Sequence, residues 1–204
     1  MEKDSFITIE GMAEGIYKEK GSKFMGFAWP VVSEEEIKDR MDYLRKKYHD
    51  ARHHCYAWRL GAEGTHFRYS DDGEPTGTGG PPILGQIRSR KLTNVLTVVV
   101  RYFGGTLLGA GGLMRAYKAA ASDTLDHGKI VKQFIQNTYS ISFGYKKMSV
   151  VMKILNDLKL EPFNQEFEMN CRLKTRVRAG LSNKFEKLFL PYDDIKVDVM
   201  GKKH

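Results

Sequence analysis

Alternating apolar and polar positions predict a series of short strands in the first part of the chain. Residues 5–10 are expected to form a strand or an ordered arm, and residues 15–32 a hairpin that turns at Gly21-Ser22. Residues 53–60 alternate between two faces, and residues 65–70 are their expected hairpin partner. Strands joined as hairpins are thus the main elements expected here.

Apolar side chains at helical spacing mark two helices in the same part of the chain. Ser33 and Glu36 form a capping box, which satisfies free N–H groups at the start of a helix. Residues 109–112 open the second helix, which is expected to end near Gly128. The inward face of the first helix is expected to comprise Ile37, Met41, Leu44 and Tyr48.

The stretch from Ser70 to Lys118 reads SDDGEPTGTGGPPILGQIRSRKLTNVLTVVVRYFGGTLLGAGGLMRAYK. It predicts an acidic turn, a Gly/Pro loop, a short helix, a strand and a glycine-rich turn that opens a helix. The strand is apolar enough to be buried on both faces. Arg101 near its end, followed by glycines and a helix N-terminus, can place positive charge and free N–H groups around an anion.

After residue 137 the pattern predicts a second domain. Its order, βαββαβ, is the split ferredoxin-like pattern. An α+β fold of two domains is therefore expected, residues 1–136 and residues 137–204. The elements expected in the second domain are strands at 139–143, 163–170, 171–179 and 195–199, with helices at 145–160 and 181–190.

Composition limits the classes of protein that remain. The chain has 204 residues, 41% hydrophobic and 28% charged, as in ordinary globular proteins, and its net charge of +8 permits a phosphate-rich partner without requiring one. Cys55 and Cys171 lie far apart, which suggests reduced thiols. The N-terminus is too charged for a signal peptide, and no uncharged apolar run approaches the ~18 residues of a membrane span. A cytoplasmic protein without a membrane segment is expected.

Two motifs, SDDGEPTGTGGPPIL and VVVRYFGGTLLGAGGL, resemble those of the YigZ/IMPACT family in sequence and order. The family signature is an Arg-aromatic-aromatic-Gly-Gly strand end after a Gly/Pro loop, here Arg101 to Gly105. The resemblance implies an N-terminal α/β domain of the ribosomal-protein type, like domain IV of elongation factor G, and a ferredoxin-like C-terminal domain like its domain V. It also implies a link to translation and nucleic-acid binding. Eukaryotic members restrain a translation-initiation kinase, and no catalytic residues come with the family.

The glycine-rich turn meets the requirements of neither common nucleotide-binding motif. A P-loop needs Lys and then Ser or Thr after its second glycine, where this chain has Ala110 and Gly111. The dinucleotide motif fails because Met114 takes the place of its third glycine. The glycines of this turn, Gly104 and Gly105 among them, are expected either to permit tight packing or to form a backbone nest for an RNA phosphate.

Three acidic residues, Asp71, Asp72 and Glu74, precede the Gly/Pro loop. Converging carboxylates can hold a metal ion, but three acids within four residues usually form a solvated turn. They can also pair with nearby basic residues and hold the loop in place. Arg101 ends an apolar strand, so it is expected either to reach one of these carboxylates or to face an anion. No metal and no cofactor are expected.

The strand expected at residues 171–179 carries four basic residues on one face, Arg172, Lys174, Arg176 and Arg178. Glu166 and Glu168 of the preceding strand are expected to lie opposite two of them. The face is expected to be either a solvated surface with ion pairs or a binding surface for phosphates. Because the alternation places no aromatic side chain there, base-specific reading of RNA is not expected.

The sequence therefore predicts a non-enzymatic, translation-associated regulator that binds RNA or the ribosome through basic surfaces. The alternatives are a protein-interaction module in translation or stress control, and an enzyme acting on a phosphorylated small molecule. One basic surface is the face of residues 171–179. The other is expected in the central stretch and comprises Arg88, Arg90, Lys91, Arg101, Gly104, Gly105, Arg115 and Lys118.

Overall fold

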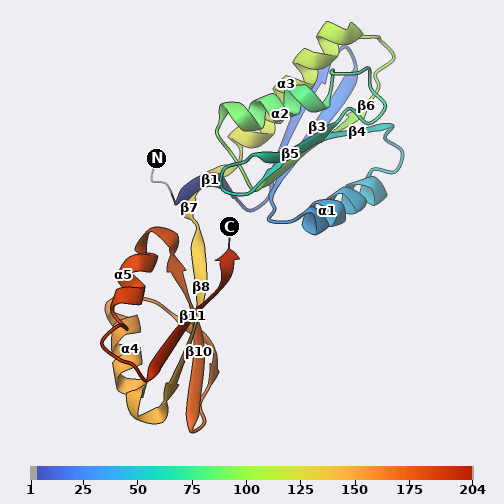
Figure 1. The fold of residues 1–204 in the computed structure, drawn as a ribbon. Helices are drawn as coiled ribbons and strands as arrows, with labels where there is room; N and C mark the ends of the chain where they lie inside the picture. Colours follow the sequence, from blue (N-terminus) through green and yellow to red (C-terminus); the bar gives the residue numbers. More distant parts are fainter. Residues whose placement is uncertain (1–3, 204) are drawn as a thin grey trace. The chain divides into compact units, whose positions relative to one another are not determined.

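In the computed structural model, which describes residues 4–203, the chain has an α+β fold and divides into two compact units (Figure 1). The first unit contains Phe6–Gln133. The second contains the chain from Phe134 onward together with Asp4 and Ser5. That each unit folds on its own stays a prediction. No helix among the described residues is long and apolar enough to cross a membrane.

The first unit is built on a five-stranded sheet in which all neighbouring strands are antiparallel. The strand expected to be buried on both faces is the central one, and every position in it up to Arg101 is buried. In spatial order the strands are β2 (Ala13–Glu19), β3 (Ser22–Pro30), β6 (Val95–Tyr102), β4 (His53–Leu60) and β5 (His66–Ser70).

Helices cover both faces of this sheet (Figure 1). Helix α1 (Glu34–Lys47) packs against one face, where its buried side chains meet those of Val98 and Val100. Helices α2 (Gly80–Ser89) and α3 (Gly109–Asp126) pack against the other, around Val95 and Val99. The period-two alternation of β6 therefore supplies both hydrophobic cores.

Helix α1 begins as the sequence predicts, with a small difference in its capping bonds. The Ser33 hydroxyl accepts a hydrogen bond from the Glu36 N–H at 3.2 Å. The Glu36 carboxylate accepts from the N–H of Val32 at 2.8 Å, one residue before the cap. Both bonds satisfy N–H groups at the entrance of the helix, as a capping box does.

Two further strands, β1 (Ser5–Glu10) and β7 (Lys129–Phe134), form a small sheet of their own. Strand β8 begins at Gln136, so one residue separates it from β7. Ile135 between them donates its N–H to the carbonyl oxygen of Asp4 at 2.9 Å.

The second unit has four strands in the spatial order β11-β8-β10-β9, all antiparallel. With one helix after the first strand and one after the third, this is the split ferredoxin-like arrangement that the sequence predicts. Its core includes Tyr139, Ile141, Leu173 and Phe185. The elements are β8 (Gln136–Gly144), η1 (Tyr145–Lys147), α4 (Met148–Asp157), β9 (Pro162–Glu166), β10 (Asn170–Arg178), η2 (Ala179–Leu181), α5 (Ser182–Lys187) and β11 (Ile195–Lys203).

Two elements of this unit are shorter than expected. The strand predicted at 163–170 ends at Glu166, and the pairing of β9 with β10 is irregular between Arg172 and Lys174. Asn164 in β9 has a φ of +47°, a left-handed conformation that alternation alone does not reveal. The helix predicted at 181–190 is limited to six residues, preceded by a short 3₁₀ turn.

Candidate nucleic-acid interface

The acidic loop has structural partners for each of its carboxylates. Asp71 accepts hydrogen bonds from the backbone N–H groups of Gly77, Gly79 and Gly80, each at 2.8 Å. It thereby caps helix α2, which has no capping side chain at Gly79 itself. Asp72 accepts from the N–H of His54 at 2.7 Å. These acids hold the Gly/Pro loop in place mainly through backbone N–H groups.

Glu74 and Arg101 form a buried ion pair. Of the two arrangements expected for Arg101, the structure therefore shows contact with a carboxylate of the acidic loop. The Nη1 atom of Arg101 lies 2.6 Å from Oε1 of Glu74, and their side chains are 7% and 3% exposed. The Tyr117 hydroxyl donates to the same oxygen at 2.8 Å.

Burial raises the pKa of the nearby Cys55 thiol, whose Sγ donates to the Asp71 carbonyl, so this cysteine is a neutral structural group.

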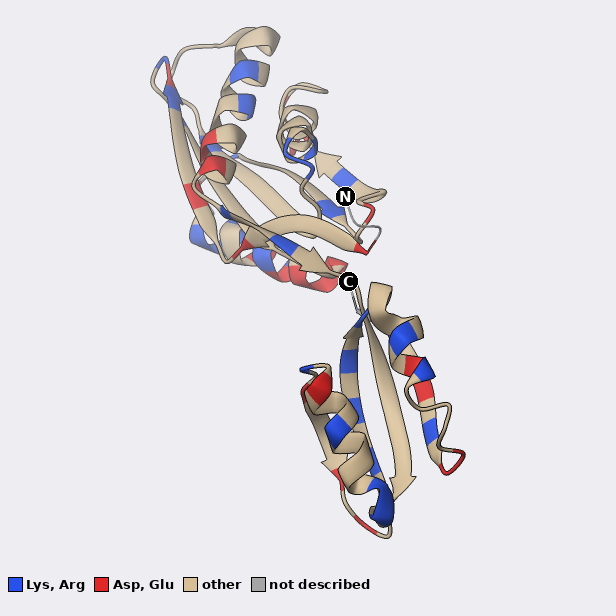
Figure 2. Cartoon of the chain, turned by 90° about the vertical axis from the view of Figure 1, so that its left-hand side faces the viewer, with Lys and Arg blue, Asp and Glu red and all other residues tan. Residues whose placement is uncertain are grey.

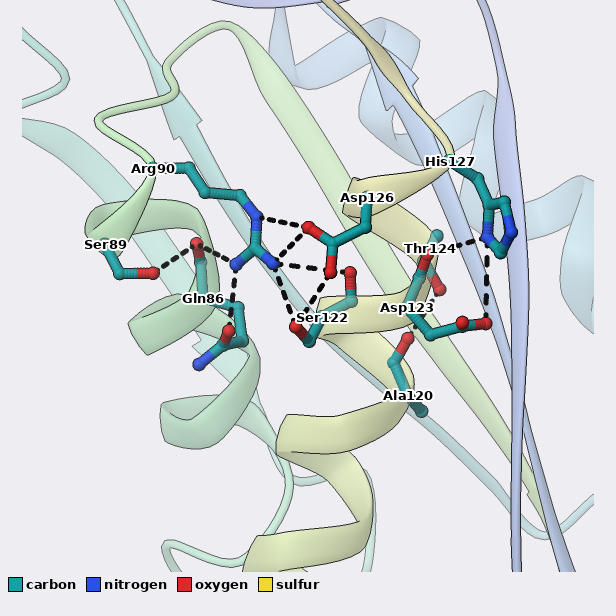
Figure 3. A network of polar contacts seen from close by, with 9 residues as sticks. All are labelled: Gln86, Ser89, Arg90, Ala120, Ser122, Asp123, Thr124, Asp126 and His127. Atoms are coloured by element: carbon teal, nitrogen blue, oxygen red, sulfur yellow. Dashed lines mark hydrogen bonds and ion pairs between the residues drawn. The ribbon is translucent and has the colours of Figure 1, made fainter.

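Arg90 is bound between helices α2 and α3 (Figure 3). Its Nε lies 3.2 Å from Oδ1 of Asp126, its Nη2 donates to Ser122 Oγ at 2.9 Å, and its Nη1 donates to Gln86 Oε1 at 2.9 Å. The hydrogen bonds from Arg90 lower the pKa of Asp126 below its usual value. Arg90 therefore joins two helices, a role that the charge pattern alone did not suggest.

The other basic residues of the central stretch lie on or just after α2 and on α3. Arg88 lies at the C-terminal end of α2 with its guanidinium 4.3 Å from the Phe67 ring, and Lys91 follows it. Arg101 lies near the C-terminal end of β6. Arg115 and Lys118 are exposed on α3. The six basic residues of the central stretch are therefore carried by β6, by α3 and by the end of α2, and that they form one binding surface stays a prediction.

Gly104 is required by close packing. A Cβ at this position would lie 1.9 Å from the carbonyl carbon of Gly21, far inside any allowed contact. Its N–H donates to the Ser22 hydroxyl at 3.1 Å, and the next residue, Gly105, has a φ of +86°. The glycines after Arg101 therefore serve the tight turn that was one of their two expected roles.

The exposed face of the second unit's sheet holds the strongest row of basic side chains. Figure 2 shows Lys and Arg repeated along this sheet, whereas acidic and basic residues are mixed over the first unit. We call Arg172, Lys174 and Arg176 of β10 the basic row. Each lies beside a short polar residue of β8, namely Ser142, Ser140 and Thr138. No carboxylate of the described residues forms an ion pair with Lys174 or Arg176.

The expectation that this face carries no aromatic side chain is wrong. The irregularity in β9 places Phe163 opposite Lys174 while Glu166 still lies opposite Arg172. The Arg176 guanidinium lies 4.7 Å from the centroid of the Phe163 ring. Glu168, expected to offset a second basic residue, lies beyond the end of β9. The face therefore combines a basic row with a stacked ring.

The fourth expected basic residue, Arg178, is bound by a residue from the start of the chain. Its Nε and Nη2 lie 2.7 and 2.9 Å from the two carboxylate oxygens of Asp4. The hydrogen bond from Arg178 lowers the pKa of Asp4 to about 2. No sequence signal connects two residues 174 positions apart, so this pair was not foreseen.

Two hollows accompany the basic row. One, of about 560 Å³, is lined by Arg172 and Lys174 together with Ser140 and Ser142, and the carboxylates of Glu166 and Asp198 also line it. The other, of about 460 Å³, is lined by Phe163, Arg176 and neighbouring residues. An extended polyanion can place phosphates beside long basic side chains over the short polar residues of β8. This geometry suits binding of a nucleic-acid backbone.

The fold and the motifs define a class of protein, and the comparisons with known proteins agree. The family model named Impact N-terminal domain matches residues 20–125. The chain is 30% identical over 198 residues to the IMPACT family member YvyE of Bacillus subtilis (strain 168), covering 96% of this chain and 90% of the relative. It is 31% identical over 163 residues to the IMPACT family member YigZ of Escherichia coli (strain K12), covering 79% of this chain and 80% of the relative. This chain belongs to the IMPACT family.

A solved structure extends the similarity to the whole fold. The match is to a crystal structure described as that of a hypothetical protein, with a TM-score of 0.75 and 26% sequence identity. It covers 97% of this chain and 98% of the chain in that structure. Both units of the present chain therefore have counterparts in a single solved protein.

Proposed function

We propose that this protein is a cytoplasmic, non-enzymatic regulator of translation that binds RNA or the ribosome through the basic row. The observation that carries the proposal is the exposed face of β10. There Lys174 and Arg176 form no ion pair with a carboxylate of the residues that the structure describes, and the Phe163 ring lies beside them. The net charge of +8 and the link to translation implied by the family resemblance agree with it.

The geometry favours recognition of charge and shape. Side chains two residues apart on one strand are about 7 Å apart, so the basic row can contact several phosphates of one extended strand. A single Arg–Phe stack can support one or a few bases without reading their edges. The expected ligand is a single-stranded or looped segment of RNA with little sequence preference.

The test is binding of the full chain to a structured RNA with single-stranded loops, measured by filter binding over a range of salt concentrations. Replacing the basic row by alanine should weaken binding and reduce the log–log salt slope by about two, because about three phosphate contacts are lost. The control, with the same change in charge, replaces three exposed lysines on the helices of the same unit, Lys153, Lys184 and Lys187. Equal effects of the two triple variants would contradict a specific role of the basic row.

A protein-interaction module is the second candidate. Phe167 and Met169, between β9 and β10, are 51% and 91% exposed, and adjacent exposed apolar side chains often mark protein contacts. A complex recovered by pull-down that resists salt and is lost in Phe167→Ser would favour this candidate over RNA binding. We further propose that the two units correspond in fold to domains IV and V of elongation factor G, which superposition of each unit would test.

A further inference from the structure

A cavity of about 510 Å³ lies in the first unit where β4 begins and β6 ends. His53 and Arg101 line it and are paired directly across these two strands. Its volume lies within the range of small-molecule sites. The basic row belongs to the other unit, so this cavity is independent of the function proposed above.

Arg101 brings unused hydrogen-bond donors to the cavity wall. Among the described residues its guanidinium has one hydrogen-bond partner, Glu74, and its Nε is buried with none. The rings of Phe24 and Phe103 lie 5.4 and 5.6 Å from the guanidinium carbon and offer no acceptor oxygen. Arg101 lines the cavity, so the guanidinium N–H groups that Glu74 does not use can donate to a ligand there.

His53 presents a second polar group whose state follows from its partner. Its Nδ1 lies 2.9 Å from the carbonyl oxygen of Asp72, and a carbonyl only accepts, so Nδ1 carries a proton. In the neutral ring Nε2 is then an acceptor for a hydroxyl, and in the protonated ring it is another donor. Arg101 and His53 together can therefore contact both an anionic oxygen and a hydroxyl of one ligand.

The charges around the cavity leave room for an anion. Arg52 lies on the lining and is exposed. The carboxylate of Asp50 accepts the Tyr102 hydroxyl at 2.6 Å, and that of Glu74 is bound to Arg101. The two carboxylates thus have partners, while Arg52 has no ion pair among the described residues.

An apolar wall completes the cavity. Phe103 and Leu107, from the turn between β6 and α3, are 55% and 83% exposed. A guanidinium recognises a phosphate through paired hydrogen bonds, and an exposed aromatic ring stacks on a nucleobase. We propose that this cavity binds a nucleotide, either free or at the end of an RNA chain. Its phosphate lies against Arg101 and Arg52, and its base lies against Phe103.

The experiment is an NMR titration of the full chain with adenosine monophosphate, uridine monophosphate and inorganic phosphate. Both nucleotides should shift the signals of the cavity residues. Phe103→Ala should weaken nucleotide binding roughly fivefold or more, because one stacking contact is lost, and Arg52→Ala should weaken it several-fold. Arg115→Ala, which removes an exposed arginine outside the cavity, is the matched control and should leave binding unchanged. Arg101 is left intact because its replacement is expected to destabilise the unit.

A short RNA with a terminal phosphate distinguishes the two sources of the nucleotide. If the RNA binds more tightly than the mononucleotides and its binding is weakened by Phe103→Ala, the source is a chain end. If the mononucleotides bind equally well or better, the source is the free nucleotide. Absence of binding at millimolar concentrations would overturn the proposal, as would binding of inorganic phosphate as tight as that of the nucleotides. Loss of RNA binding on replacing the basic row would not affect this site.

Discussion

The buried pair of Glu74 and Arg101 allows a sharp prediction, because the same unit contains an exposed pair of similar length. The Arg101–Glu74 contact is 2.6 Å long with side chains 7% and 3% exposed, and the Arg90–Asp126 contact is 2.5 Å long with side chains 18% and 62% exposed. Breaking a buried pair costs about 3–5 kcal/mol, since one charge is left without a partner. Breaking a pair with one exposed member costs roughly 0–1 kcal/mol.

We therefore expect Arg101→Met to lower the free energy of unfolding of the first unit by about 3 kcal/mol. Asp126→Asn removes the charge of the exposed partner and leaves the bonds of Arg90 to Gln86 and Ser122 in place, so it should lower that free energy by about 1 kcal/mol or less. Tyr117→Phe removes one hydrogen bond to the same carboxylate and should cost roughly 1.5–3 kcal/mol. Adding Glu74→Gln to Arg101→Met should cost less than the sum of the single changes, because the two side chains interact directly.

The assay is urea unfolding followed by tryptophan fluorescence. The two tryptophans of the chain, Trp29 and Trp58, both lie in the core beneath α1, so the signal reports the first unit alone. A loss of 3 kcal/mol should lower the urea midpoint by roughly 1–3 M with an unchanged slope. If Arg101→Met shifted the midpoint no more than Asp126→Asn, burial would not be what makes this pair important, and the reasoning would fail.

Three further predictions concern other parts of the chain. Gly104→Ala should destabilise the first unit by about 1–3 kcal/mol, because its Cβ would overlap Gly21. Gly85→Ala has no atom near its Cβ, so it should leave stability unchanged or raise it by about 0.5–1 kcal/mol. The same fluorescence assay compares the two variants. Asp4 has a folded-state pKa of about 2 against an ordinary 3.8, so its stabilising effect is complete above pH 3.8 and is lost as the pH falls towards 2. Asp4→Asn should remove the part of the stability that is lost as the pH falls towards 2, as followed by circular dichroism of the second unit. If stability depended on pH in the same way in Asp4→Asn, the role of the Asp4–Arg178 pair would be contradicted. A fragment of residues 134–204 should unfold cooperatively when heated, and the intact chain should be nicked by protease near residues 126–139; a fragment without a transition would argue against independent folding.

Local patterns in the sequence were sufficient to predict most of the fold. The alternation in residues 53–60 and the apolar run before Arg101 correspond to β4 and β6, because the side-chain period of a strand does not depend on distant residues. The cap at Ser33 is equally local. The order of elements after residue 137 sufficed for the ferredoxin-like arrangement because few topologies suit it.

Features that depend on tertiary contacts could not be predicted in the same way. Asp71 caps a helix that begins nine residues later, so its role is visible only once the loop is folded. The position of Phe163 depends on an irregular pairing at Asn164, which moved an aromatic ring to the basic face. Among the candidate site residues, the six basic ones of the central stretch were grouped by their sequence neighbourhood, and the structure distributes them over β6, α3 and the end of α2.

The bond between Asp4 and Arg178 has a consequence for how the protein is made. Asp4 is synthesised 174 residues before its partner. At roughly 5–20 residues per second, the ribosome takes about 10–35 s to deliver Arg178 after Asp4. The whole sequence of the first unit is synthesised within that interval and can fold, whereas Asp4 cannot yet bind Arg178. The second unit is therefore discontinuous in sequence, and the bond between Asp4 and Arg178 can form only after the whole of the first unit has been synthesised.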